Sequence, residues 1–350
     1  MNPLPAASFA MRPLGAVVGA VARRRRRNAR PSVRLSERVV SVGNIVAGGV
    51  GKTPMVAYLV RMLREDGRRV GVVTGAYGAR PTRRRTSAGR AFRCDIVRGA
   101  DLPADAVARV GDETVMLAAE LGDVPVAGGR PKARAAEWLS THETLDFIVV
   151  DDGFQHHALA RDVNIVLLDA QAPFDNGRVL PAGRLRESPA ALRGADAIVV
   201  TGDQRAPAEW VTCSDVLAPG VTVLTAEHVA VRGRDHPSGS AVALTALAGL
   251  AALGVCGLGA PASFRRTLQQ LGADADMMAY PDHHAYTSND FRRIYERAGG
   301  RRILTTAKDA TKWMGRAKFA YTVIDVELRV NDPDALLACA TAASDIRGPL

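Results

Sequence analysis

The sequence predicts an α/β fold in which a doubly wound parallel sheet is followed by a second, smaller α/β domain. Three observations support this prediction. Continuous apolar runs, of the kind found in strands that helices cover on both faces, alternate with helix-like segments. The connections between them are short, which favours parallel strands joined by helices. A smaller set with the same pattern follows in the C-terminal third of the sequence.

An apolar run of ten residues, 13–22, is followed at once by five arginines. Residues 1–34 hold eight arginines and no acidic residue, so the formal net charge of +10 is mostly local. A nucleic-acid-binding protein would spread its basic residues differently. A membrane span needs about 20 apolar residues, and extending the run back to Pro3 would place Arg12 near its centre, where a charge is costly.

We therefore expect residues 1–34 to associate with a membrane, as an interfacial anchor whose basic flank attracts anionic lipid. A weak membrane span and a solvated basic tail or nucleic-acid arm are the alternatives. The four cysteines have no CxxC spacing, which indicates neither a disulfide framework nor a zinc site.

The first strand is expected at residues 38–43, directly before a glycine-rich loop, and an amphipathic helix is expected over residues 53–67. The next apolar runs predict strands that are buried on both faces; they lie at residues 68–75, 145–152, 163–170 and 195–202. Together these elements predict the doubly wound sheet of a large domain over residues 35–226.

The smaller set predicts strands at residues 251–259, 301–309 and 320–328, with a helix over residues 261–272. The stretch 226–240 contains Gly, Pro and Ser and is a plausible connection between the domains. We therefore assign residues 227–350 to a smaller C-terminal α/β domain.

The loop "SVGNIVAGGVGKTP" (41–54) resembles a phosphate-binding loop, but Val46 stands where the first glycine of GxxxxGK[ST] belongs. The candidate nucleotide-binding residues are Ala47, Gly48, Gly49, Val50, Gly51, Lys52 and Thr53. The glycines let backbone N–H groups turn toward phosphate oxygens. Lys52 can neutralise the β- and γ-phosphates, and the Thr53 hydroxyl can bind Mg²⁺. A flexible turn would not explain Lys-Thr at a helix start, so the large domain is predicted to be P-loop NTPase-like.

An acidic pair supports the nucleotide site. Asp151 and Asp152 end the apolar run "FIVVDD", where a Walker B aspartate holds or orients the metal. Either residue alone could cap the following helix. As a pair at a strand end beside a phosphate-binding loop, they are predicted to be metal ligands.

Six blocks of sequence resemble, in order, those of the tetraacyldisaccharide 4'-kinase family, the lipid A 4'-kinases. They are "SVGNIVAGGVGKTP" (41–54), "VGDETVMLA" (110–118), "VVDDGFQHHALARD" (149–162), "NGRVLPAGRLRES" (176–188), "YPDHHAYTSND" (280–290) and "TTAKDATKW" (305–313). The resemblance runs from about residue 38 to residue 326 and includes the valine at position 46. A basic-flanked N-terminal segment, here before residue 35, is a further trait of the family.

The resemblance implies transfer of the γ-phosphoryl group of ATP to the 4'-hydroxyl of a tetraacylated disaccharide 1-phosphate lipid, with Mg²⁺ as cofactor. It further implies an aspartate–histidine dyad, Asp112 and His283, in which the histidine accepts the hydroxyl proton and the aspartate orients its ring. Asp282 is the other candidate for the orienting role. Asp112 and His283 lie far apart in the sequence, so a cleft between the domains would have to join them.

The resemblance also implies roles for residues around the nucleotide site. Glu113 and Glu187 would be metal-linked, whereas Gln155, His156 and Arg186 would support the site or the substrate. Roles cannot be separated for the neighbouring His157 and His284. Tyr77 matches a tyrosine near the nucleotide, but Gly75 and Ala76 replace the family's Arg-Gly, and Ala260 replaces an asparagine.

The family assignment also implies a place for the protein at the cytoplasmic face of the bacterial inner membrane, without a nucleic-acid or protein partner. The alternative is a P-loop GTPase or ATPase of the metal-chaperone or partition type that acts on a protein. "TAKD" (306–309) is similar to a guanine-reading motif, but its lysine is one position off. A protein of that type would not need an apolar and polybasic N-terminus.

Overall fold

The computed structural model describes residues 11–85, 89, 91–202, 216–259, 261–281 and 284–342. The chain divides into two compact units, one of Met1–Ala226 with Val330–Leu350 and one of Glu227–Arg329. The division after residue 226 lies at the expected boundary, whereas residues 330–350, expected in the smaller domain, belong to the first unit. In the structure α11 (Pro333–Thr341) contacts α3 (Lys52–Glu65), and the Arg38 guanidinium donates to the carbonyl of Ala340 at 2.7 Å.

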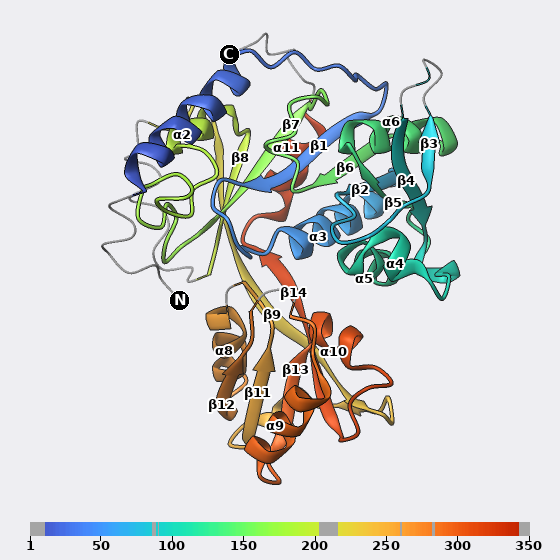
Figure 1. The fold of residues 1–350 in the computed structure, drawn as a ribbon, viewed down its shortest axis with the longest axis vertical. Helices are drawn as coiled ribbons and strands as arrows, with labels where there is room; N and C mark the ends of the chain where they lie inside the picture. Colours follow the sequence, from blue (N-terminus) through green and yellow to red (C-terminus); the bar gives the residue numbers. More distant parts are fainter. Residues whose placement is uncertain are drawn as a thin grey trace. The chain divides into compact units, whose positions relative to one another are not determined.

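The first unit is built on a mostly parallel sheet with the strand order β9-β8-β7-β1-β6-β2-β5-β4-β3 (Figure 1). Its strands are β1 (Arg38–Asn44), β2 (Val70–Thr74), β3 (Arg83–Arg85), β4 (Ala91–Val97), β5 (Val126–Arg130), β6 (Phe147–Asp151), β7 (Val163–Asp169), β8 (Ala197–Thr201) and the start of β9 (Thr222–His236). All described pairings from β2–β5 across to β8–β9 are parallel, whereas β3–β4 and β4–β5 are antiparallel. The predicted α/β fold is confirmed.

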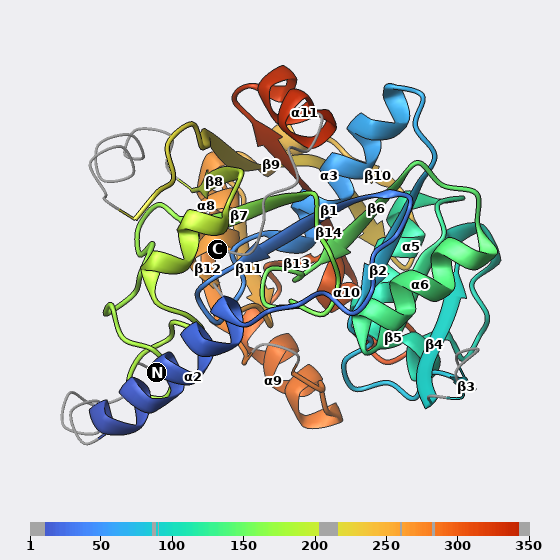
Figure 2. The same ribbon diagram turned by 90° about the horizontal axis from the view of Figure 1, so that it is seen from above.

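Helices cover both faces of this sheet. Figure 2 shows α3 and α6 (Lys132–His142) on opposite sides of the central strands β1, β6 and β2. The cluster under α6 takes alternate residues of β6, Ile148 and Val150, together with Leu139 of the helix. Since both faces are covered, every residue of β6 is buried, as the continuous apolar run predicted. The shorter helices α4 (Ala106–Val110) and α5 (Asp112–Leu121) precede β5, and α5 contacts α3.

The strands of the second unit follow β9 in the same strand order, as β9-β14-β13-β11-β12. The strands are β11 (Ala251–Cys256), β12 (Asp274–Ala279), β13 (Arg302–Thr306) and β14 (Tyr321–Val330), and the two-residue β10 (Ala241–Val242) pairs with β9. The helices are α8 (Pro261–Gln270), α9 (Ser288–Ala298) and α10 (Ala307–Trp313). This is the predicted smaller α/β domain.

The apolar run near the N-terminus lies in α2 (Arg12–Arg27), which packs on the first unit. Gly15 and Gly19 are buried, and a Cβ at Gly15 would lie 2.8 Å from the carbonyl oxygen of Val179, so the helix approaches that segment closely. The opposite side of the helix exposes Leu14 and Val17, at 51% and 59%. Within the described part of the chain, no helix has the length and apolar character that crossing a membrane requires.

Candidate active site

The glycine-rich loop joins β1 to α3 and requires glycine at two positions. Gly48 has φ 128°, and a Cβ there would lie 2.2 Å from Nη2 of Arg184. Gly51, the residue before the helix, has φ 86°. Both values lie in the region that side chains disfavour. Helix α3 begins at Lys52, so its free N–H groups and the positive end of its dipole face the loop, which is the arrangement that binds phosphate.

Val46, in place of the expected first glycine, belongs to the core of the protein. It forms an isolated antiparallel bridge with Leu185, and both side chains are buried in one apolar cluster with Ile45 and Phe154. The amide of Ala47 donates to the carbonyl of Arg184 at 2.7 Å. The loop therefore starts as a short strand-like pairing with residues 184–186, which needs a side chain for packing rather than the freedom of glycine.

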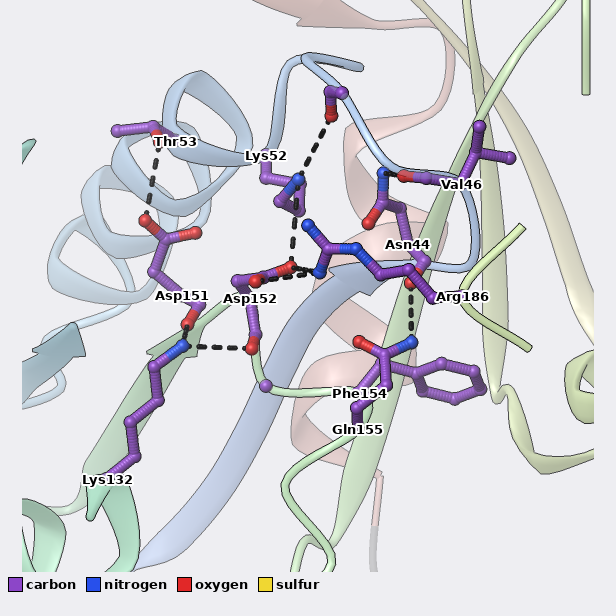
Figure 3. Close-up of polar contacts among 12 residues, drawn as sticks. Asn44, Val46, Lys52, Thr53, Lys132, Asp151, Asp152, Phe154, Gln155 and Arg186 are labelled. Atoms are coloured by element: carbon purple, nitrogen blue, oxygen red, sulfur yellow. Dashed lines mark hydrogen bonds and ion pairs between the residues drawn. The ribbon is translucent and has the colours of Figure 1, made fainter. Parts of the chain in front are cut away.

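Lys52 and Thr53 of the glycine loop contact the acidic pair at the end of β6. Thr53 Oγ1 donates to Oδ2 of Asp151 at 3.3 Å, and Lys52 Nζ lies 3.7 Å from Oδ1 of Asp152 (Figure 3). The other oxygen of Asp151, Oδ1, is buried without a hydrogen-bond partner. Burial raises the pKa of Asp151 to about 6. The structure thus brings four of the predicted residues, Lys52, Thr53, Asp151 and Asp152, to one place.

Asp152 follows the strand in the left-handed region, with φ 50°. Arg186 donates from Nη1 to both of its carboxylate oxygens, at 2.8 and 2.9 Å. Burial opposes ionisation of Asp152, but the charges of Lys52, Arg186 and Lys132 outweigh it and lower its pKa. Asp152 is therefore held as a carboxylate in a strained turn.

Lys132 is part of this site and was missed by the sequence analysis. It is the first residue of α6 and is only 2% exposed. Its ammonium donates to the backbone carbonyls of Asp151 and Asp152 at 2.6 and 2.9 Å (Figure 3). Burial lowers the pKa of Lys132. Nothing in the sequence distinguishes it from a surface lysine, because its role depends on how α6 meets the end of β6.

Asp112 and Glu113 start α5, directly after Gly111, whose φ is 87°. Asp112 Oδ1 accepts the amide of Glu113 at 3.0 Å. Burial and the charge of Lys132 have the largest effects on the pKa of Asp151. The charge of Glu113 comes next and raises this pKa. The predicted partners of Asp112, His283 and Asp282, lie outside the described residues, so the dyad stays a prediction.

The predicted supporting residues take different places. Gln155 Nε2 donates to the carbonyl of Asn44 at 2.8 Å, which ties the turn after β6 to the end of β1. Burial, and then the charge of Lys132, lower the pKa of His156 to about 4, so this imidazole is neutral at pH 7. Glu187 is bound by Arg26 of α2 at 2.8 Å, and its predicted link to the metal stays a prediction.

The loop that contains Tyr77 carries a guanidinium despite its altered sequence. Arg130, from the end of β5, donates to the carbonyl of Gly75 at 2.7 Å and lies 4.4 Å from the centre of the Tyr77 ring. A Cβ at Gly75 would meet that ring at 2.5 Å. Ala76, which by resemblance stands in place of a glycine, adopts φ 47°. The substitution therefore places a side chain in a conformation that glycine adopts without strain.

His284 and the TAKD motif of the second unit have structural contacts. His284 stacks on Tyr280 at 4.6 Å and pairs through Nε2 with Asp290 at 3.1 Å. Asp309 is fully buried and accepts bonds from the amide of Gly257 and from the Tyr286 hydroxyl. Since both Asp309 oxygens are used within the fold, this motif does not offer a carboxylate for reading guanine.

The donor set suits Mg²⁺. No group of three or more His, Cys, Asp or Glu residues with metal-binding geometry occurs among the described residues. Mg²⁺ nevertheless keeps several waters and is usually held by one or two carboxylates together with substrate phosphates. Asp151 has an unsatisfied buried oxygen that points to a missing cationic partner, and the Thr53 hydroxyl lies beside it. These residues fit the ion.

Comparisons with known proteins agree on one family. Residues 7–343 match the family described as tetraacyldisaccharide-1-P 4'-kinase, LpxK. The tetraacyldisaccharide 4'-kinase of Syntrophus aciditrophicus is 37% identical over 315 residues, which cover 85% of this chain and 82% of that protein. The enzyme of the same name from Anaeromyxobacter dehalogenans strain 2CP-C is 38% identical over 289 residues, or 81% and 74% of the two chains.

A solved structure shows the same fold. The "apo" form of LpxK from Aquifex aeolicus in complex with ATP superposes with a TM-score of 0.70. The match is 24% identical in sequence and covers 95% of this chain and 98% of the other.

Proposed function

The chain belongs to the tetraacyldisaccharide-1-P 4'-kinase family, and from this premise we propose that it transfers the γ-phosphoryl group of ATP to the 4'-hydroxyl of a tetraacylated disaccharide 1-phosphate lipid. The observation that carries the proposal is the meeting of Lys52 and Thr53, at the start of α3, with Asp151 and Asp152, at the end of β6. Phosphoryl transfer requires mainly the positioning and neutralisation of phosphate charge, and this arrangement supplies both.

Each of these residues has a separate task. The loop amides and the start of α3 bind phosphate oxygens, while the Lys52 ammonium neutralises charge on the β- and γ-phosphates. Thr53 and Asp151 would hold Mg²⁺, which when bound neutralises charge that develops on the phosphates. Asp152 keeps Lys52 and Arg186 in place through its two carboxylate oxygens.

The acceptor hydroxyl needs a base, because a sugar hydroxyl is a poor nucleophile. We assign this role to His283, with Asp112 orienting its imidazole and stabilising the charge that forms; Asp282 is the alternative orienter. The 4'-oxygen forms a bond to the γ-phosphorus, the bond between that phosphorus and the β,γ-bridging oxygen breaks, and ADP leaves. The hydroxyl proton passes to His283. This part of the proposal depends on the family resemblance.

Helix α2 supports a location at the cytoplasmic surface of the inner membrane. Exposed apolar residues of the helix and its N-cap are spaced three or four residues apart and so share one face; they are Met11, Leu14, Val17 and Val21. Four arginines follow in its last turn, Arg24 to Arg27. An apolar face beside a basic cluster is the combination that binds an anionic membrane surface.

The function is tested by measuring ATP turnover of the full chain with and without a detergent-solubilised tetraacyldisaccharide 1-phosphate. We expect turnover to require the lipid. Turnover that ignores the lipid but responds to a protein would favour the partition or metal-chaperone alternative. In the same assay, His283→Ala should lower kcat by about 10²–10⁴, the usual contribution of a general base; near-normal kcat would remove His283 from that role.

A further inference from the structure

One arginine of the basic cluster in α2 points into the protein. Arg26 donates from Nε to Oε2 of Glu187 at 2.8 Å and from Nη2 to Oε1 at 3.1 Å. Its guanidinium also lies over the ring of Phe154, 4.3 Å from the centre. Glu187 is only 4% exposed, so this two-pronged pair is largely shielded from water. Arg24, Arg25 and Arg27 are exposed. Arg26 therefore differs from the other three arginines of the cluster, which are exposed.

The segment that Arg26 holds also binds the nucleotide site at three points. Glu187 is adjacent in sequence to Arg186, which binds both oxygens of Asp152. The amide of Arg186 donates to the carbonyl of Ile45 at 2.7 Å. Arg184 is bonded to Ala47 through its carbonyl and its guanidinium. Residues 184–187 thus form a strap that connects α2 with the start of the glycine loop and with the acidic pair.

We propose that Arg26 is a positioning residue of the nucleotide site: through Glu187 it fixes the strap, so that Arg186 holds Asp152 and residues 45–47 are held at the entrance of the phosphate-binding loop. The inference rests on the proposed function only insofar as the site binds ATP. It makes α2 part of the nucleotide-binding machinery as well as a membrane-facing element.

The geometry explains why the link is specific. A lysine at position 26 would keep the charge but lose the two parallel bonds that fix the carboxylate's orientation. A shift of the strap would act on the acidic pair and on the glycine loop together, because Arg186 contacts Asp152 and Arg184 contacts Ala47. Loss of Arg26 should therefore weaken ATP binding even where no lipid is present.

The test is equilibrium binding of a fluorescent ATP analogue with Mg²⁺ to the full chain without lipid. We expect Arg26→Ala to weaken binding by about tenfold or more, in the range of a lost charge-assisted pair. The matched control is Arg25→Ala, which removes the same charge from the same helical turn at an exposed position; it should change the affinity by less than about twofold. Equal affinities for the two variants would overturn the proposal.

A second variant tests whether Arg26 positions the strap or only neutralises the buried carboxylate of Glu187. In Arg26→Ala/Glu187→Gln no charge is left unpaired, so the fold is spared that cost, but the link is still absent. Weak binding by the double variant supports positioning, whereas full recovery of affinity would overturn it.

A double-mutant cycle measures whether the effect of Arg26 on ATP affinity depends on Arg186. In an Arg186→Ala background the strap no longer acts on Asp152, so Arg26→Ala should cost less than it does in the unmodified chain. Full additivity of the two substitutions would contradict the proposed route. Because the readout is nucleotide binding, a chain that binds ATP through Arg26 but does not phosphorylate the lipid would refute the proposed function and leave this inference standing.

Discussion

Val46 forms an antiparallel bridge with Leu185, and both side chains are buried in one apolar cluster. This pairing explains why the loop lacks its usual first glycine. We predict that Val46→Gly, which recreates the common pattern, destabilises the protein by about 2–4 kcal/mol through the lost packing and the added chain freedom.

The same substitution should not improve ATP affinity, since position 46 precedes the turn made by Gly48 and Gly51. Chemical unfolding and nucleotide titration measure the two quantities. Tighter ATP binding by the glycine variant at unchanged stability would show that the valine is a defect of the loop rather than a part of the core.

Lys132 should matter for both stability and activity. Lys132→Ala removes the ammonium that binds the carbonyls of Asp151 and Asp152, and hydrogen bonds to charged groups contribute about 1.5–3 kcal/mol each. We expect a lower free energy of unfolding and a lower kcat, because the turn at Asp152 is strained and relaxes without its partner. Thermal unfolding and steady-state kinetics check this, with Arg134→Ala, two residues further along α6, as the control. Unchanged kinetics in the Lys132 variant would confine this lysine to a packing role.

The acidic pair should respond to neutralisation in opposite directions. Burial raises the pKa of Asp151 to about 6, so between the unfolded value of 3.8 and 6 the folded state binds more protons and stability falls as pH rises. Asp151→Asn should remove this loss and stabilise the nucleotide-free protein by about 1–3 kcal/mol at pH 8, while abolishing phosphoryl transfer. The gain should vanish near pH 4, where the carboxyl group is protonated.

Asp152→Asn is the matched control. The folded-state pKa of Asp152 is lowered, because Lys52, Arg186 and Lys132 outweigh its burial, so its charge adds stability above the unfolded pKa and that contribution is lost as pH falls. The variant should therefore be less stable at pH 8. Unfolding curves that moved in the same direction for both variants would contradict the electrostatics of this site.

Ala76 should tolerate glycine better than other buried alanines do. Its φ of 47° costs an L-residue about 1–2 kcal/mol, which offsets what glycine loses in chain entropy and packing. We expect Ala76→Gly to stay within about 0.5 kcal/mol of the unmodified protein or to exceed it, whereas Ala57→Gly, in the buried interior of α3, should cost about 1–2 kcal/mol. Equal losses in denaturant titrations would argue against strain at residue 76.

Local pattern was sufficient for much of the fold and for the centre of the site. The continuous apolar runs led to β1, β6, β7 and β8 because strands covered on both faces leave that signature. Lys52, Thr53 and the aspartate pair could be predicted because phosphate and metal binding require these residue types directly at a helix start and a strand end.

Contacts between residues far apart in the sequence could not be predicted from local patterns. The burial of Lys132 depends on where α6 meets β6. The pairing of Glu187 with Arg26 joins residues 161 positions apart. Residues 330–342 belong to the first unit because of the tertiary contacts of α11. The resemblance links Glu187 to the metal, and it gives no indication of the ion pair with Arg26. The hydrophobic periodicity of a sequence contains no information about such pairings.

The central claim is that this site delivers the terminal phosphate of ATP to a lipid sugar. The most direct measurement incubates the full chain with γ-labelled ATP and tetraacyldisaccharide 1-phosphate, then determines whether and where the lipid is labelled. We predict one labelled phosphate on the 4'-oxygen, absent when Lys52→Ala replaces the unmodified chain. Label that appears only as free phosphate, or on a protein, would contradict the account.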